Sequence, residues 1–92
     1  MNHFFDYASA TPIHPLVKEA MEPFWCDQFY NPSALYSGSI AVREQIKNAR
    51  ASVAKTLEVR PREITFTSGC TEANNLAITG VLSQYPNAKI LV

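Results

Sequence analysis

The sequence has few cysteines, no excess charge and no long apolar run, and each shortage excludes a class of protein. Its 92 residues contain two cysteines, too few for a disulfide scaffold. Eight Lys+Arg balance eight Asp+Glu, so there is no basic excess to bind a nucleic-acid backbone. No apolar run is long enough to span a membrane, and the N-terminus lacks the features of a signal peptide. We therefore expect a cytoplasmic protein with reduced thiols and without nucleic-acid or membrane partners.

The composition that is present indicates a folded chain. Hydrophobic residues make up 47% and charged residues 17%, a balance typical of globular rather than disordered proteins. A chain this short buries a small core, which leaves little room for a complete enzyme active site and its supporting residues. The length therefore favours a piece of a longer protein.

Two helices are predicted in the first two thirds of the chain. The first runs from Pro15 to Phe24 with an interruption near Pro23, because proline suits a first helical turn and breaks a later one. The second follows an Asn31-Pro32-Ser33 turn and is capped by Ser37 or Ser39. Its apolar positions recur every three or four residues: Val42, Ile46, Ala49, Val53 and Leu57. Its opposite face is expected to be solvated: Arg43, Glu44, Lys47, Asn48 and Lys55.

The last third predicts a strand, a helix and a second strand. Glu63–Thr67 alternates in polarity and is rich in residues that favour strands. A third helix runs from Cys70 to about Ser83, and the apolar segment Ala88–Val92 resembles a strand buried in a parallel sheet. This order predicts a βαβ unit, and therefore an α/β fold with a mainly parallel sheet.

The junction Thr67–Asn75 is the strongest candidate for a binding site. A helix N-terminus presents unpaired amides and a partial positive charge, which suit a phosphate. Gly69 allows close approach of the backbone, and Thr71 adds a hydroxyl donor. The same residues also fit an ordinary helix cap, in which Ser68 or Thr71 acts with Glu72 and no ligand is involved.

Two further groups of residues carry structural interpretations. Cys26 is interpreted as a small core residue. The aromatic residues near it are interpreted as packing or dimer contacts: Phe24, Trp25, Phe29 and Tyr30. His3 and His14 lack an acidic partner at metal-ligand spacing, so no metal site is assigned.

The segment Phe66–Ile78, read as Phe-Thr-Ser-Gly-Cys-Thr-Glu-Ala-Asn-Asn-Leu-Ala-Ile, resembles the phosphate-binding segment of cysteine desulfurases. These enzymes are class V aminotransferase-like proteins that use pyridoxal 5'-phosphate (PLP). Asp6–Pro12, Tyr30–Ala34 and Arg62–Thr67 resemble the family's N-terminal arm, its Gly-Asn-Pro-Ser turn and the strand before the phosphate loop. Tyr30 replaces the usual glycine of the turn, and Tyr36 stands where the family often has histidine.

The resemblance implies roles for six residues. The Cys70 amide and the Thr71 amide and hydroxyl would hold the PLP phosphate, with Gly69 beside them. Asn31 and the arm residues Ala8 and Ser9 would line the substrate side of the pocket. The family's Schiff-base lysine and sulfur-carrying cysteine lie farther along the enzyme. No residue of this chain is therefore assigned a catalytic or metal-binding role.

The resemblance also implies a fold and an activity. The chain would be the N-terminal part of a PLP-dependent transferase of fold type I. Residues 1–36 would form the arm and a short helix, 37–59 the long helix, and 63–92 the start of the cofactor-binding sheet.

The parent enzyme would convert L-cysteine to L-alanine and pass sulfur to an enzyme cysteine. It would act in iron–sulfur cluster assembly as a homodimer, with a sulfur-acceptor protein as partner. The fragment would be inactive alone. The alternatives are a non-catalytic remnant or interaction module, or part of another class V enzyme such as a selenocysteine lyase or an aminotransferase.

Overall fold

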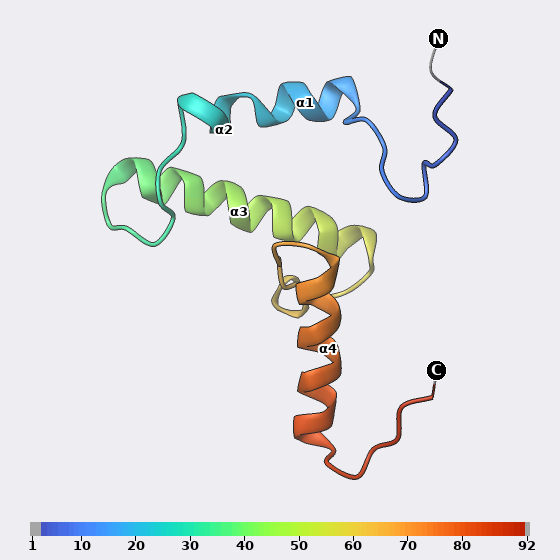
Figure 1. Ribbon diagram of the computed structural model, residues 1–92. Coiled ribbons are helices and arrows are strands. Elements are labelled where there is room, and N and C mark those ends of the chain that lie inside the picture. Colours follow the sequence, from blue (N-terminus) through green and yellow to red (C-terminus); the bar gives the residue numbers. More distant parts are fainter. Residues whose placement is uncertain (1–2, 92) are drawn as a thin grey trace. The chain divides into compact units, whose positions relative to one another are not determined.

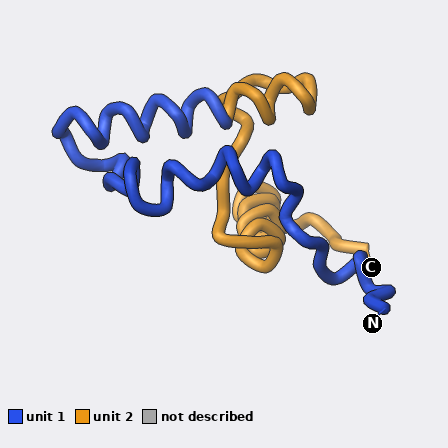
Figure 2. Tube along the Cα trace, turned by 90° about the horizontal axis from the view of Figure 1, so that it is seen from above, with its two compact units in different colours: residues 1–49 blue, residues 50–92 orange. Residues whose placement is uncertain are grey.

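The regular structure of the chain is helical in the computed structural model, which describes residues 3–91 (Figure 1). The chain divides into two compact units, residues 1–49 and 50–92, which Figure 2 shows in different colours. Val92, the predicted end of the second strand, lies outside the described residues, as do Met1 and Asn2 of the N-terminal sequence.

Two short helices follow the N-terminal arm in the first unit. Helix α1 spans Pro15–Met21, and Nδ1 of His14 accepts a hydrogen bond from the Leu16 N–H at 3.3 Å. Helix α2 spans Pro23–Cys26, with proline at its first position. Proline lacks an N–H and cannot continue a preceding helix, so Glu22 ends α1 and precedes α2. The predicted interruption near Pro23 is confirmed.

The long helix α3 spans Ser37–Thr56, as the periodicity indicates. Its buried side chains differ from the predicted stripe. Val42 is buried, but Val53 is 39% and Leu57 is 61% exposed. Ser39 and Ala54 are the other buried residues among those described, and the Ser39 hydroxyl has no hydrogen-bond partner there. The regular spacing of apolar residues therefore predicted the helix correctly. It did not predict which side chains of the helix are buried.

The end of α3 is closed by a left-handed residue. The Val59 N–H donates to the Ala54 carbonyl at 3.0 Å, and the Glu58 N–H donates to the Lys55 carbonyl at 3.3 Å. This pair of bonds is the Schellman motif, whose left-handed position is usually glycine. Here Glu58 occupies it with φ 55°, so its side chain adds strain at an exposed position.

We expect Glu58→Gly to raise the free energy of unfolding by about 0.5–1 kcal/mol, because glycine adopts this conformation without a Cβ penalty. Urea denaturation followed by circular dichroism measures the change. Glu58→Ala removes the same charge but keeps the Cβ. If Glu58→Ala stabilises the protein as much as Glu58→Gly, charge and not backbone strain is the cause.

The predicted α/β fold with a βαβ unit is wrong, because the structure has no strand within residues 3–91. Pro61–Glu63 forms a 3₁₀ turn in which the Ile64 N–H donates to the Pro61 carbonyl at 3.2 Å. The rest of the segment predicted as the first strand is irregular, and so are residues 88–91 of the second. A strand exists through hydrogen bonds to a neighbouring strand, and alternating polarity alone does not supply that neighbour.

The third predicted helix is confirmed as α4, which spans Cys70–Gln84. Its side chains are exposed along the whole helix. Beside its second half lies an apolar pocket of about 240 Å³ lined by Ala77, Ile78, Val81 and Ile90. In the described part of the chain no helix is both long and apolar enough to cross a membrane.

Candidate functional site

The first turn of α4 places the three predicted phosphate-binding residues consecutively. Gly69 is the N-cap residue, with an extended backbone (φ 167°, ψ −176°) and no capping side chain. Cys70 and Thr71 follow as the first two helical residues. Within residues 3–91, no side chain accepts a hydrogen bond from the amides of these three residues. An added Cβ on Gly69 would meet no atom within 4 Å. The amides are therefore open to an anion.

Glu72 is held away from these amides by Ser68. Its Oε2 accepts from the Ser68 N–H at 2.8 Å and from the Ser68 hydroxyl at 2.5 Å. These two bonds, the hydroxyl first, lower the pKa of Glu72 from its ordinary value of 4.5, since both favour the charged carboxylate. The predicted alternative, in which Ser68 acts with Glu72 and no ligand is involved, forms in part. Ser68 and Glu72 are paired, but the N-cap residue Gly69 has no side-chain cap, and the amides of Gly69, Cys70 and Thr71 stay uncovered.

The bond to Ser68 makes the start of α4 sensitive to acid. The pKa of Glu72 is lower in the folded chain, so its contribution to stability is present above the ordinary pKa and is lost as pH falls through the lowered value. We expect Ser68→Ala to raise the pKa of Glu72 towards 4.5 in a carbon-13 NMR titration of the carboxyl group. Thr67→Ala is the control, because the Thr67 hydroxyl donates to the Gly69 carbonyl and not to Glu72. An unchanged pKa in Ser68→Ala would contradict the assignment.

Asn31, predicted to line the substrate side, forms the turn that its Asn-Pro sequence predicts. Its Oδ1 accepts from the Ser33 N–H at 2.9 Å, and its carbonyl accepts from the Ala34 N–H at 3.2 Å. The side-chain oxygen is therefore used inside the turn. The Nδ2 donor has no hydrogen bond among the described residues and remains open to a ligand.

Ala8 and Ser9, the other predicted substrate residues, lie in a second turn in the N-terminal arm. The Asp6 carbonyl accepts from the Ser9 N–H at 3.1 Å and from the Ser9 hydroxyl at 2.9 Å. Both residues are exposed. They belong to the first unit together with Asn31, whereas the open amides of α4 belong to the second.

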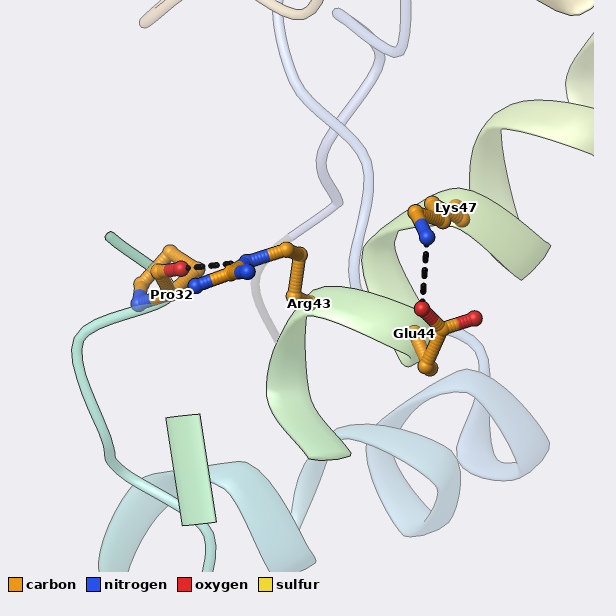
Figure 3. Close-up of polar contacts among 4 residues, drawn as sticks. All are labelled: Pro32, Arg43, Glu44 and Lys47. Atoms are coloured by element: carbon orange, nitrogen blue, oxygen red, sulfur yellow. Dashed lines mark hydrogen bonds and ion pairs between the residues drawn. The ribbon is translucent and has the colours of Figure 1, made fainter. Parts of the chain in front are cut away.

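The predicted solvent face of α3 contains one residue that behaves differently. Arg43 is half-buried, and it donates from Nε to the Pro32 carbonyl at 2.8 Å and from Nη2 to the Ala34 carbonyl at 2.6 Å. Lys47, one helical turn later, makes an exposed pair with Glu44 at 2.6 Å, as expected (Figure 3). The sequence pattern did not distinguish the two residues. The only sequence signal that distinguishes Arg43 is the Asn-Pro turn nearby, which has two backbone carbonyls that need hydrogen-bond donors.

Both cysteines are exposed free thiols. The interpretation of Cys26 as a core residue is therefore wrong; it ends the short helix α2 at the surface. The Cys70 sulfur accepts a long hydrogen bond of 3.5 Å from Nδ2 of Asn74. Residues 3–91 contain no group of three or more side chains able to hold a metal ion.

Comparisons with known proteins give one consistent result. The profile of the family described as "Aminotransferase class-V" matches residues 3–92. Cysteine desulfurase IscS of Rickettsia prowazekii (strain Madrid E) is 45% identical over 87 residues, which are 94% of this chain and 21% of that protein. Cysteine desulfurase IscS of Dictyoglomus turgidum is 45% identical over 78 residues, 85% of this chain and 20% of that protein. The chain spans about a fifth of the length of these relatives. No solved structure matches it significantly.

Proposed function

Because the chain belongs to the class V aminotransferase family, we propose that it is the N-terminal part of a PLP-dependent cysteine desulfurase. Family membership confirms the resemblance found in the sequence. The proposed parent enzyme converts L-cysteine to L-alanine and transfers the sulfur to an enzyme cysteine. This chain contributes binding groups to that reaction and no catalytic residue.

The phosphate of PLP is proposed to bind at the start of α4. The amides of Gly69, Cys70 and Thr71 are open, and the backbone at Gly69 has space for a ligand atom. A helix N-terminus attracts a phosphate by its partial positive charge, and the Thr71 hydroxyl adds a fourth donor. The one acidic side chain of this turn, Glu72, is held by Ser68. These open amides are the observation that carries the proposal.

The substrate side is proposed to use Asn31, Ala8 and Ser9. The free Nδ2 of Asn31 is a donor suited to a carboxylate such as that of an amino acid. PLP, when bound, supplies an electron sink for the bonds of the amino acid. The residues of this chain hold and orient the two molecules.

The proposal also covers the oligomeric state, the partner and the location of the parent enzyme. We infer a homodimer that passes sulfur to an acceptor protein for iron–sulfur cluster assembly. We place the enzyme in the cytoplasm, because exposed thiols such as Cys26 and Cys70 persist there in the reduced form.

Titration of the isotope-labelled chain with pyridoxine 5'-phosphate tests the phosphate site. This compound lacks the PLP aldehyde and cannot react with lysine side chains, so amide shifts report the phosphate contact alone. We expect saturable NMR shifts at Gly69, Cys70 and Thr71, with the same residues responding to inorganic phosphate. Shifts spread over surface lysines, with none at these three amides, would disprove the site.

A further inference from the structure

Arg43 joins the helix α3 to the turn that carries Asn31. Its guanidinium donates to the Pro32 carbonyl (Figure 3) and to the Ala34 carbonyl, and these two residues flank Ser33 in the sequence. The two donors belong to one planar group, so together they fix the orientation of the turn as well as its distance from the helix. Half-burial and the positive charge of the donor strengthen both bonds.

The bonds of Arg43 complement those inside the turn. Asn31 accepts from Ser33 through its side chain and from Ala34 through its carbonyl. Arg43 binds two of the carbonyls that those bonds leave unused. The turn is thus closed internally and tied to α3 externally, and the Asn31 Nδ2 group is left as a side-chain donor for a ligand.

We propose that Arg43 is a positioning residue for the substrate side of the site. It contacts no ligand itself; it holds the Asn31–Ala34 turn so that Nδ2 of Asn31 is presented in one orientation. This inference rests on the proposed function of Asn31. Its chemistry requires arginine, because a lysine nitrogen is a single point and cannot take both carbonyls in the same planar geometry.

The first test uses the chain itself and asks whether Arg43 orders the turn. Nitrogen-15 order parameters at Asn31, Ser33 and Ala34 are expected to fall from about 0.85 to below about 0.6 in Arg43→Gln, with Arg43→Lys between. Lys47→Gln is the matched control: it removes one positive charge from the same helix, and its pair with Glu44 is exposed. Unchanged order parameters in Arg43→Gln would overturn the anchoring role.

The second test measures function in a full-length context. The chain is fused to the part of the Rickettsia prowazekii cysteine desulfurase that follows the matched segment, and KM and kcat for L-cysteine are compared. Arg43→Gln is expected to raise KM by about tenfold, the cost of losing a charged hydrogen bond, with a smaller change in kcat. Arg43→Lys restores part of the affinity, and Lys47→Gln changes neither constant.

The outcomes separate this inference from the proposed function. An active fusion whose KM is unaffected by Arg43→Gln overturns the positioning role and leaves the proposed function intact. If Arg43→Gln lowers the amount of folded protein but the folded fraction keeps its KM, Arg43 has a purely structural role. Absence of pyridoxine 5'-phosphate shifts at Gly69–Thr71 in the unsubstituted chain overturns the phosphate site whatever Arg43 does, and an inactive unsubstituted fusion overturns the substrate role of Asn31 and Arg43.

Discussion

Gly38→Ala is expected to destabilise the first unit by about 1–3 kcal/mol, the usual cost of overpacking. A Cβ on residue 38 would lie 2.6 Å from Cδ2 and 2.9 Å from Cγ of the Tyr30 ring. That ring is stacked on Phe29 at 5.3 Å between centroids and forms a T-shaped pair with Tyr36 at 5.9 Å, so moving it away from the new Cβ would disturb both ring contacts. Fluorescence of Trp25, the only tryptophan, reports the unfolding of this unit during urea denaturation.

The cause of the Gly38→Ala effect can be separated from helix propensity. Gly80→Ala is the control, because its added Cβ would meet nothing within 4 Å beyond the adjoining backbone of its own helix, and alanine is expected to stabilise α4 by up to about 1 kcal/mol. Tyr30→Gly restores the residue that is usual in the family's turn and removes the ring. In the double variant with Gly38→Ala the clash should therefore be absent, so the two changes should show a coupling free energy. Additive effects of Tyr30→Gly and Gly38→Ala would contradict the proposed contact.

Cys70→Pro is expected to weaken pyridoxine 5'-phosphate binding by about tenfold or more, because it removes one amide hydrogen bond to a charged group. Proline is tolerated at the first position of a helix, and the extended backbone of Gly69 is compatible with a following proline. The helix should therefore remain intact. The same NMR titration measures the affinity.

Cys70→Ala shows whether the amide or the thiol of this residue matters. Alanine keeps the amide and removes the sulfur, so its affinity should stay near that of the unsubstituted chain. Equal affinity losses in Cys70→Ala and Cys70→Pro would implicate the thiol, and no loss in Cys70→Pro would exclude the amide. Circular dichroism confirms that α4 is present in both variants.

The helices were predictable because their signals are local. Pro15 and Pro23 each indicate the start of a helix, because the chemistry of proline itself restricts where it can stand in one. The spacing of apolar residues in α3 follows from the pitch of a helix. The Asn31 turn is also local, since a side chain bonds a backbone amide two residues away. Such features require no knowledge of distant parts of the chain.

The two strand predictions were wrong, because alternating polarity describes one surface of a strand and does not supply the neighbouring strand that it needs. Ile64 and Phe66 alternate with polar residues as in a strand. In the structure, Ile64 follows a 3₁₀ turn, and the Phe66 ring lies under the Arg50 guanidinium at 5.3 Å. An aromatic side chain that a sheet would bury can instead bind a cation on the face of its ring. Sequence spacing alone does not distinguish these two outcomes.

The candidate site was predicted in part. The order of glycine, cysteine and threonine at the start of α4 located the open amides, which are a property of any helix N-terminus. The role of Arg43 was missed, because its bonds reach a turn nine to eleven residues earlier in the sequence. Helical spacing places Arg43 and Lys47 on the same face of α3. Only the path of the chain before α3 brings backbone carbonyls to Arg43, whereas Lys47 pairs with Glu44.

The two exposed thiols, one in each unit, provide separate points of chemical attachment. Cys26 lies in residues 1–49 and Cys70 in residues 50–92, and neither is bonded to the other. A maleimide dye on one cysteine, with the other replaced by serine, would therefore follow the melting of one half of the molecule independently. Comparison of the two melting curves would show whether the halves unfold together or in sequence.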